Sequence, residues 1–284
     1  MKNTMKKLVV LLLSMMMVTS LLAGCGKEPV TAESLIQNMQ GGAYTSCDMD
    51  MMMSLKMTSS VDTGLMGSVS MDVETLMNAN LKSDMDTSVT SGEMTMKMIG
   101  FTYSVPITTY VQLDADKMTE YSQTEKDGPW YYTITEDAEY ENLLENVEIL
   151  QGIDLSVIQN LTLTEPTEEA PEYVVTGTLA FKDMVDVMGS DMKELIESMG
   201  SVSEDLSAYY DTLVYDVTYV FDGETEILKS AKVALKVGEA ATTNAVSITE
   251  LVIECTYNQW NDITVEVPAE VIQNATELSL DGNN

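Results

Sequence analysis

Hydrophobic and polar residues alternate along much of the chain, so that every second side chain is apolar. The longest run begins at Met49, where methionine or leucine fills each odd position up to Met57 and the even positions are mostly polar. A period of two over many segments is typical of antiparallel strands with one buried and one solvated face. The pattern predicts strands at residues 47–58, 69–73, 81–89, 94–98, 108–113, 117–122, 130–135, 173–179, 213–221, 231–237, 251–257 and 263–267.

Three other segments, at residues 33–39, 140–147 and 181–199, have apolar residues at helical spacing. Gly41 and Gly42 predict the end of the first helix. A sheet with one apolar face must bury that face against another layer, and these helices are too few to cover so many strands. We therefore expect an α+β fold: a curved antiparallel sheet of about ten strands, forming an incomplete barrel wrapped around two or three helices.

The N-terminal segment has the layout of an export signal. Three lysines precede an apolar run from Leu8 to Leu22, which ends in Leu22-Ala23-Gly24-Cys25. The run is short for a membrane-spanning helix, which needs about 20 apolar residues. The last four residues resemble the bacterial lipobox, in which the cysteine sulfur receives a diacylglycerol and the chain is cut just before it. An ordinary secretory signal that happens to contain a cysteine is the alternative.

The lipobox prediction divides the chain into four parts. Residues 1–24 are the signal peptide, 25–32 a lipidated tether, 33–275 a single domain and 276–284 a flexible tail. Two acyl chains, such as palmitate, hold a protein stably on a membrane where one chain does not. The expected location is the extracytoplasmic face of the cell membrane, with the lipid on Cys25 as the attachment.

The predicted mature chain is strongly acidic. Removing residues 1–24 leaves 260 residues, takes away three lysines and changes the formal charge from −32 to −35. Every basic residue is lysine, because the chain contains no arginine and no histidine. This composition excludes histidine-based catalysis, imidazole metal ligands and bidentate arginine clamps. A surface of this charge repels nucleic acid and anionic lipid headgroups, so we expect no nucleic-acid partner.

Methionine is unusually frequent, at 23 of 284 residues, and much of it falls on the predicted buried faces. Three interpretations fit: thioether ligands for Cu(I), an adaptable apolar pocket, or a core without any ligand. Copper is the least favoured because no histidine accompanies the methionines. Those of the first strand can meet those at 94–98 across the sheet. The candidate lining of a hydrophobic-ligand site comprises Met49, Met51, Met53, Met94, Met96, Met98, Met184, Met188 and Met192.

Two further cysteines, Cys47 and Cys255, lie at opposite ends of the predicted domain. Outside the cytoplasm such a pair can form a disulfide, and closing a loop of about 200 residues would contribute about 4–5 kcal/mol in the chain-entropy model. Two buried free thiols are the alternative. The sequence pairs no nucleophile with a base and has no glycine-rich phosphate loop or metal-ligand cluster, so we expect a protein that is not an enzyme and has no cofactor.

A family resemblance rests on three segments and on the order of the elements. The segments are Asp-Gly-Pro-Trp-Tyr at 127–131, residues 219–225 leading into 231–237, and residues 263–271. With the lipobox, they resemble the LppX and LprG type of Gram-positive lipoproteins over about residues 33–275, whose fold is similar to the LolA and LolB carriers. In that family an incomplete β-barrel wraps helices and leaves an apolar cavity for acyl chains. The resemblance implies a lipid or other hydrophobic ligand, and it supplies no ligand motif.

Together these observations predict a membrane-anchored protein that binds or carries a hydrophobic ligand. The acidity favours a neutral ligand or a glycolipid over an anionic one. The alternative is a non-catalytic interaction or sensory module of the cell envelope that has the same fold and a filled core.

Overall fold

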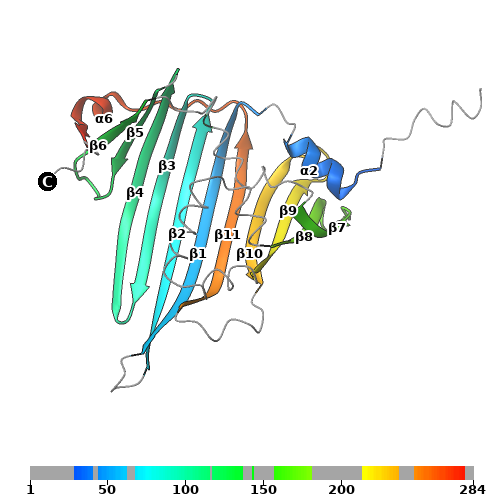
Figure 1. Ribbon diagram of the computed structural model, residues 1–284. Coiled ribbons are helices and arrows are strands. Elements are labelled where there is room, and N and C mark those ends of the chain that lie inside the picture. Colours follow the sequence, from blue (N-terminus) through cyan, green and yellow to red (C-terminus); the bar gives the residue numbers. More distant parts are fainter. Residues whose placement is uncertain are drawn as a thin grey trace, which may run out of the picture.

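The computed structural model describes residues 29–40, 44–62, 68–115, 117–136, 143, 157–180, 213–236 and 246–278. Among these residues, twelve strands form one sheet in the order β12-β6-β5-β4-β3-β2-β1-β11-β10-β9-β8-β7 (Figure 1). Neighbouring strands are antiparallel except for β12 and β6, which are parallel. The strands are β1 (Ser46–Asp62), β2 (Ser68–Asp84), β3 (Thr87–Met98), β4 (Phe101–Asp114), β5 (Lys117–Gln123), β6 (Tyr131–Thr135), β7 (Ile158–Thr164), β8 (Glu172–Ala180), β9 (Val214–Asp222), β10 (Leu228–Lys236), β11 (Val246–Trp260) and β12 (Thr276–Glu277).

Two helices belong to the described residues, α2 (Ala32–Gln40) and α6 (Ala269–Asn274). Helix α2 begins at a reciprocal cap, because the Thr31 hydroxyl accepts the Ser34 N–H at 3.0 Å and the Ser34 hydroxyl accepts the Thr31 N–H at 2.9 Å. The predicted helix at 33–39 is confirmed. No helix among these residues is long and apolar enough to span a membrane.

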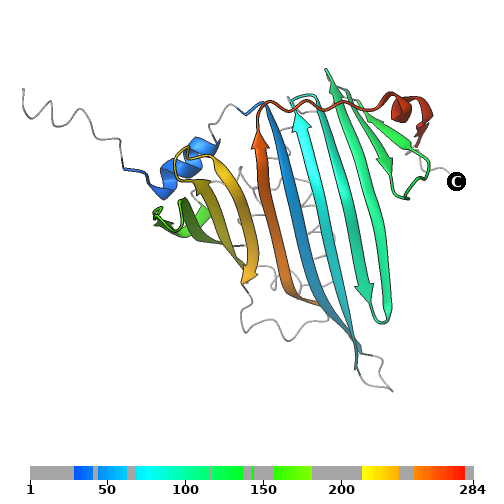
Figure 2. The same ribbon diagram turned by 180° about the vertical axis from the view of Figure 1, so that it is seen from behind.

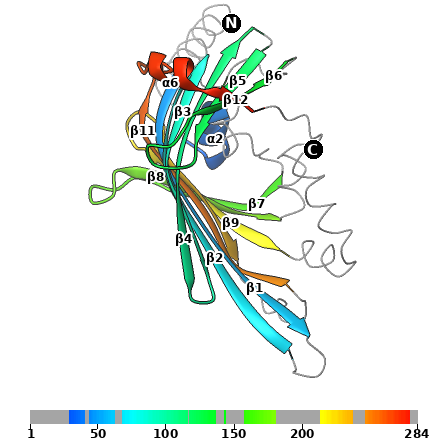
Figure 3. The same ribbon diagram turned by 90° about the vertical axis from the view of Figure 1, so that its left-hand side faces the viewer.

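The predicted fold class is wrong. The described chain is mostly β, with twelve strands rather than about ten, and its sheet stays open, with β7 and β12 at its two edges. The two helices lie towards opposite ends of this sheet and are not enclosed by it (Figures 1 and 2). The sheet twists and curves along its long strands (Figure 3), as the preferred twist of β-strands requires. The predicted helices at 140–147 and 181–199 lie outside the described residues, apart from Leu143.

Most predicted strands are confirmed, but two are not. Residues 81–89 contain a turn, because the Asp84 carboxylate accepts the backbone N–H groups of Asp86 and Thr87 at 3.0 and 2.7 Å. Residues 263–267 are irregular, since their backbone donates to side chains instead of to a neighbouring strand: Val265 N–H donates to Asp84 at 2.8 Å. Strands β7 and β12 and helix α6 were not predicted.

The best-buried core lies where α2 packs against the β7–β10 end of the sheet. Leu35 and Ile36 of α2 are fully buried, and so are Tyr215 and Phe221 of β9. They belong to one cluster that continues through β10 and β11 to the start of β1. The side chains of this cluster in β8 to β10 alternate with exposed or half-buried ones, as expected for a sheet covered on one side.

Candidate functional site

One face of the sheet carries the predicted methionines, and we call the odd-numbered side chains of β1 and their cross-strand neighbours the methionine face. Met53 of β1 lies opposite Met77 of β2, which in turn lies opposite Met94 of β3. Directly opposite residues share a face of the sheet, so these three side chains form one row. Strand β2 separates β1 from β3, and Met77 therefore stands between the two groups that the sequence predicted to meet.

This row continues in both directions without a polar side chain. Beyond Met53 it runs through Ile253 of β11 and Val233 of β10 to Val217 of β9, and beyond Met94 it reaches Val105 of β4. The row thus crosses the sheet from β9 to β4. Its β9 and β10 members are buried, whereas Ile253 and the members from β1 to β4 are half-buried. The exposed part of the apolar face therefore lies over β1 to β4 and β11.

The predicted lining residues occupy different environments. Met49 is 5 % exposed and belongs to the core, whereas Met98 is 42 % exposed at the far end of β3. Met51, Met53, Met94 and Met96 are half-buried on the methionine face. Met184, Met188 and Met192 lie outside the described residues. Sequence reasoning missed Met77, although it continues the odd-numbered pattern of β2, because threonine and alanine interrupt the apolar series on either side.

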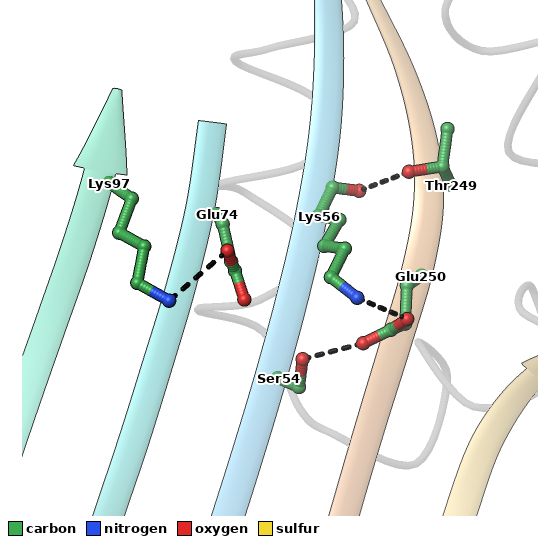
Figure 4. A network of polar contacts seen from close by, with 6 residues as sticks. All are labelled: Ser54, Lys56, Glu74, Lys97, Thr249 and Glu250. Carbon is green, nitrogen blue, oxygen red and sulfur yellow. Dashed lines mark hydrogen bonds and ion pairs between the residues drawn. The ribbon is translucent and has the colours of Figure 1, made fainter. Parts of the chain in front are cut away.

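The opposite face of the sheet is polar, and charged side chains of alternating sign cross it in one row. Lys97, Glu74, Lys56 and Glu250 lie directly opposite one another on β3, β2, β1 and β11. Lys56 binds Glu250 at 2.7 Å and Lys97 binds Glu74 at 3.4 Å, while the Ser54 hydroxyl donates to Glu250 at 2.7 Å (Figure 4). The hydrogen bonds from Lys56 and Ser54 lower the pKa of Glu250, and its carboxylate raises the pKa of Lys56.

A second polar cluster lies on the same face near the start of β1. The Asn80 side-chain amide donates to Asp48 at 2.7 Å and to Asp50 at 2.9 Å, and Asn258 donates to Asp50 at 3.0 Å. Burial alone would raise the pKa of Asp48, but the hydrogen bonds from Asn80 and Lys82 outweigh it and lower this pKa. Hydrogen bonds from Asn258 and Asn80 likewise lower the pKa of Asp50.

These polar contacts hold the register of β3, β2, β1 and β11. A slip of one residue moves every side chain of a strand to the other face, so it would place the charges of the polar face among the methionines. Each exposed ion pair contributes little to stability, but a row of them disfavours the wrong register. The polar face therefore keeps the methionine face continuous.

Two pockets involve the polar face. One of about 600 Å³ lies at the far end of β1 to β3, bordered by Lys56, Glu74, Lys97 and residues 98–102. The other, of about 540 Å³, is bordered by Asp50, Asn78, Asn80 and Glu254. Charged and hydroxyl side chains alternate with apolar ones around the first pocket, and charged and amide side chains lie beside two methionines in the second. Neither is the enclosed, predominantly apolar cavity that an apolar guest occupies.

Cys47 and Cys255 are buried free thiols in this structure. Cys255 lies opposite Met51, four residues along β1 from Cys47. At about 3.3 Å per residue this separation is roughly 13 Å, well beyond the reach of a disulfide, so the bridge that the sequence left open is not formed here. Burial raises the pKa of Cys47 to about 12 and that of Cys255 to about 11. Neither thiol is a reactive nucleophile at neutral pH.

The described residues contain no group of three or more acidic, cysteine or histidine side chains placed to hold a metal ion. The methionines of the central row come from three different strands, and their direct partners in that row, Ile253 and Val105, are apolar. The sheet therefore has one apolar face, and on the opposite face the charged and amide side chains form hydrogen bonds and ion pairs with one another.

Comparison with known proteins adds little to this description. No protein-family model matches the chain, and no curated protein matches it. Among solved structures, a porin-like protein from Bacteroides uniformis is similar at 9 % sequence identity with a TM-score of 0.20, over 73 % of this chain and 96 % of that one. A likeness this weak carries no argument about fold or function.

Proposed function

We propose that this chain is a lipid-anchored protein of the extracytoplasmic membrane face that binds an uncharged hydrophobic ligand on its methionine face. The proposal rests chiefly on the apolar row through Met53, Met77 and Met94. Half-buried methionines provide a flexible, polarisable surface that repacks around guests of different shape. The net charge of −32 favours a neutral guest over an anionic one.

The ligand site is tested with Nile red, a neutral apolar dye whose fluorescence rises in apolar surroundings. We expect the full chain to bind it, and the double variant Met53→Gln, Met94→Gln to bind it roughly tenfold more weakly, because an amide must be desolvated where a thioether was. Lipid extraction and mass spectrometry of the purified chain should in parallel reveal a co-purifying neutral lipid.

The matched control is Met52→Gln. Met52 is a half-buried methionine between Met51 and Met53, but its side chain lies on the polar face opposite Glu254 and Asn78. The Met52→Gln variant should bind the dye as the unchanged chain does. Equal binding by all three proteins would remove the methionine face as the site, whereas no binding by any of them would favour an interaction module with a filled core.

The anchor rests on Cys25 and the segment before it, and a separate experiment tests it. In cells given labelled palmitate, we expect the unchanged chain to take up the label and to lack residues 1–24. Cys25→Ala should remain unlabelled and keep those residues, because the acylated sulfur is absent. Mass spectrometry of the intact protein gives both results at once. Label on the alanine variant would place the lipid elsewhere, and an unlabelled, cleaved parent chain would indicate an ordinary secretory signal.

A further inference from the structure

Strand β4 is paired with β3 along nearly all of one side, but on the other side it is paired only along its second half. Strand β3 pairs with Phe101–Gln112, whereas β5 pairs only with Thr108–Asp114. Among the described residues no strand covers the outer side of residues 101–107. Both views of the ribbon show this half of β4 as the outermost strand at its end of the sheet (Figures 1 and 2).

The turn that precedes β4 determines which backbone groups point to this open edge. Met98 and Phe101 are partners across the two-residue turn Ile99-Gly100, and residues that flank such a turn form a hydrogen-bonded pair. Backbone groups of an antiparallel strand point alternately to its two neighbours. The odd-numbered residues of β4 therefore bond to β3, and the N–H and C=O groups of Thr102 and Ser104 point to the open side. Pro106 offers only its carbonyl there.

The side chains of this segment are apolar on one face and uncharged on both. Phe101 is 78 % exposed and Tyr103 is 68 % exposed. They lie on the methionine face with Val105 and Ile107, because Val105 is opposite Met94. Edge strands of soluble proteins are usually protected by charged side chains or irregular backbone, and residues 101–107 have no charge in a chain of net charge −32. Pro106 is the one protective residue.

We propose that a second copy of this chain pairs with this edge, antiparallel to it, with the two Ser104 residues opposite each other. Ser104 is the midpoint of the open segment, so this register uses all seven free residues. The two serines exchange both backbone hydrogen bonds, and each Thr102 N–H donates to the Pro106 carbonyl of the other copy. Phe101 then lies opposite Ile107, and Tyr103 opposite Val105, in apolar cross-strand pairs.

The charges beside the edge complement one another in this register. On β3, Lys97 lies opposite Thr102 and Glu93 lies opposite Pro106. Lys97 of one copy therefore shares a row with Glu93 of the second copy, with the two β4 strands between them and a separation of roughly 14 Å, and the symmetry gives two such rows. The twofold axis is perpendicular to the sheet, so the methionine faces of both copies lie on the same side. The apolar face and the rows of opposite charge thus both continue across the edge, which favours a second copy over an unrelated strand.

Cross-linking of single-cysteine additions in the full chain tests the register. Ser104→Cys should form an intermolecular disulfide in the cell envelope, seen as a band of doubled mass that reducing agent removes. Ser91→Cys is the matched control, because Ser91 is also exposed on the polar face but lies in β3 with strands on both sides. Equal cross-linking of the two variants would overturn the proposal.

Sedimentation of the purified full chain tests the association itself. We expect a dimer in the unchanged chain and in Ser104→Thr, and a dissociation constant at least roughly tenfold higher in Ser104→Pro, which lacks the two central donors. The Ser104 N–H points away from β3, so proline there should leave the circular dichroism spectrum and thermal unfolding nearly unchanged. A monomeric parent chain, or one that holds a different protein on this edge, would overturn the self-pairing.

Discussion

Replacing Phe221 by alanine is expected to lower the free energy of unfolding by about 4 kcal/mol. The Phe221 side chain is fully buried and lies between Tyr173 of β8 and Leu228 of β10. Its ring centroid is 6.4 Å from that of Tyr219 on the same strand. Alanine would leave a cavity beneath α2 that the rigid ends of three paired strands cannot close. Urea unfolding followed by circular dichroism measures the loss.

Phe101 provides the matched control, because it is also a phenylalanine in a strand but is 78 % exposed. Phe101→Ala should change the free energy of unfolding by no more than about 0.5 kcal/mol. Losses of similar size in the two variants would show that the core does not centre on β9. The same control variant should weaken the self-association through β4. A single substitution would then reduce assembly while leaving the free energy of unfolding nearly unchanged.

Replacing Gly92 by alanine is expected to cost about 3 kcal/mol, the upper part of the usual range for overpacking. Gly92 of β3 lies opposite Ala79 of β2 and Ile107 of β4. A Cβ atom there would lie 2.6 Å from the Ala79 Cα atom and would also collide with the Asn78 carbonyl oxygen. Both obstacles are backbone atoms, so the strands themselves would have to separate. Thermal unfolding of the full chain gives the comparison.

The control is Gly100→Ala, which also replaces a glycine but causes no steric clash. Gly100 lies in the β3–β4 turn with φ of +74°, and a Cβ atom there would meet nothing within 4 Å. Gly100→Ala should therefore cost only the strain of a left-handed residue, about 1 kcal/mol. If Gly92→Ala were no less stable than Gly100→Ala, close packing of β2 against β3 would not be the reason for glycine at position 92.

Alternation along the sequence located most strands because it is a local consequence of the pleat. It could not show which strands are neighbours. β1 pairs with β11, some two hundred residues away, and this pairing depends on the whole topology. The segment 263–267 alternates like a strand, yet the Ser46 and Asp84 side chains accept its backbone hydrogen bonds. Strand β7 was missed because a register shift between Gln159 and Thr162 interrupts its alternation.

The candidate site was predicted in part. The odd-numbered residues of β1 do share one apolar face, as the period of two requires. The intervening Met77 and the charged row behind the face depend on cross-strand register, which the sequence of one strand does not contain. The open half of β4 depends likewise on where β5 stops. Such features follow from the lengths of neighbouring strands rather than from any residue pattern.

Helix α2 packs on the side of the sheet that carries the methionines, because its partners in β8 to β10 share a face with Met53. The seven residues from Cys25 to Thr31 span at most about 25 Å when fully extended. Acylation at Cys25 would thus confine this end of the protein to a thin layer above the bilayer. An anchor on this side would turn the apolar surface towards the lipid and so shorten the distance for a guest that leaves the bilayer.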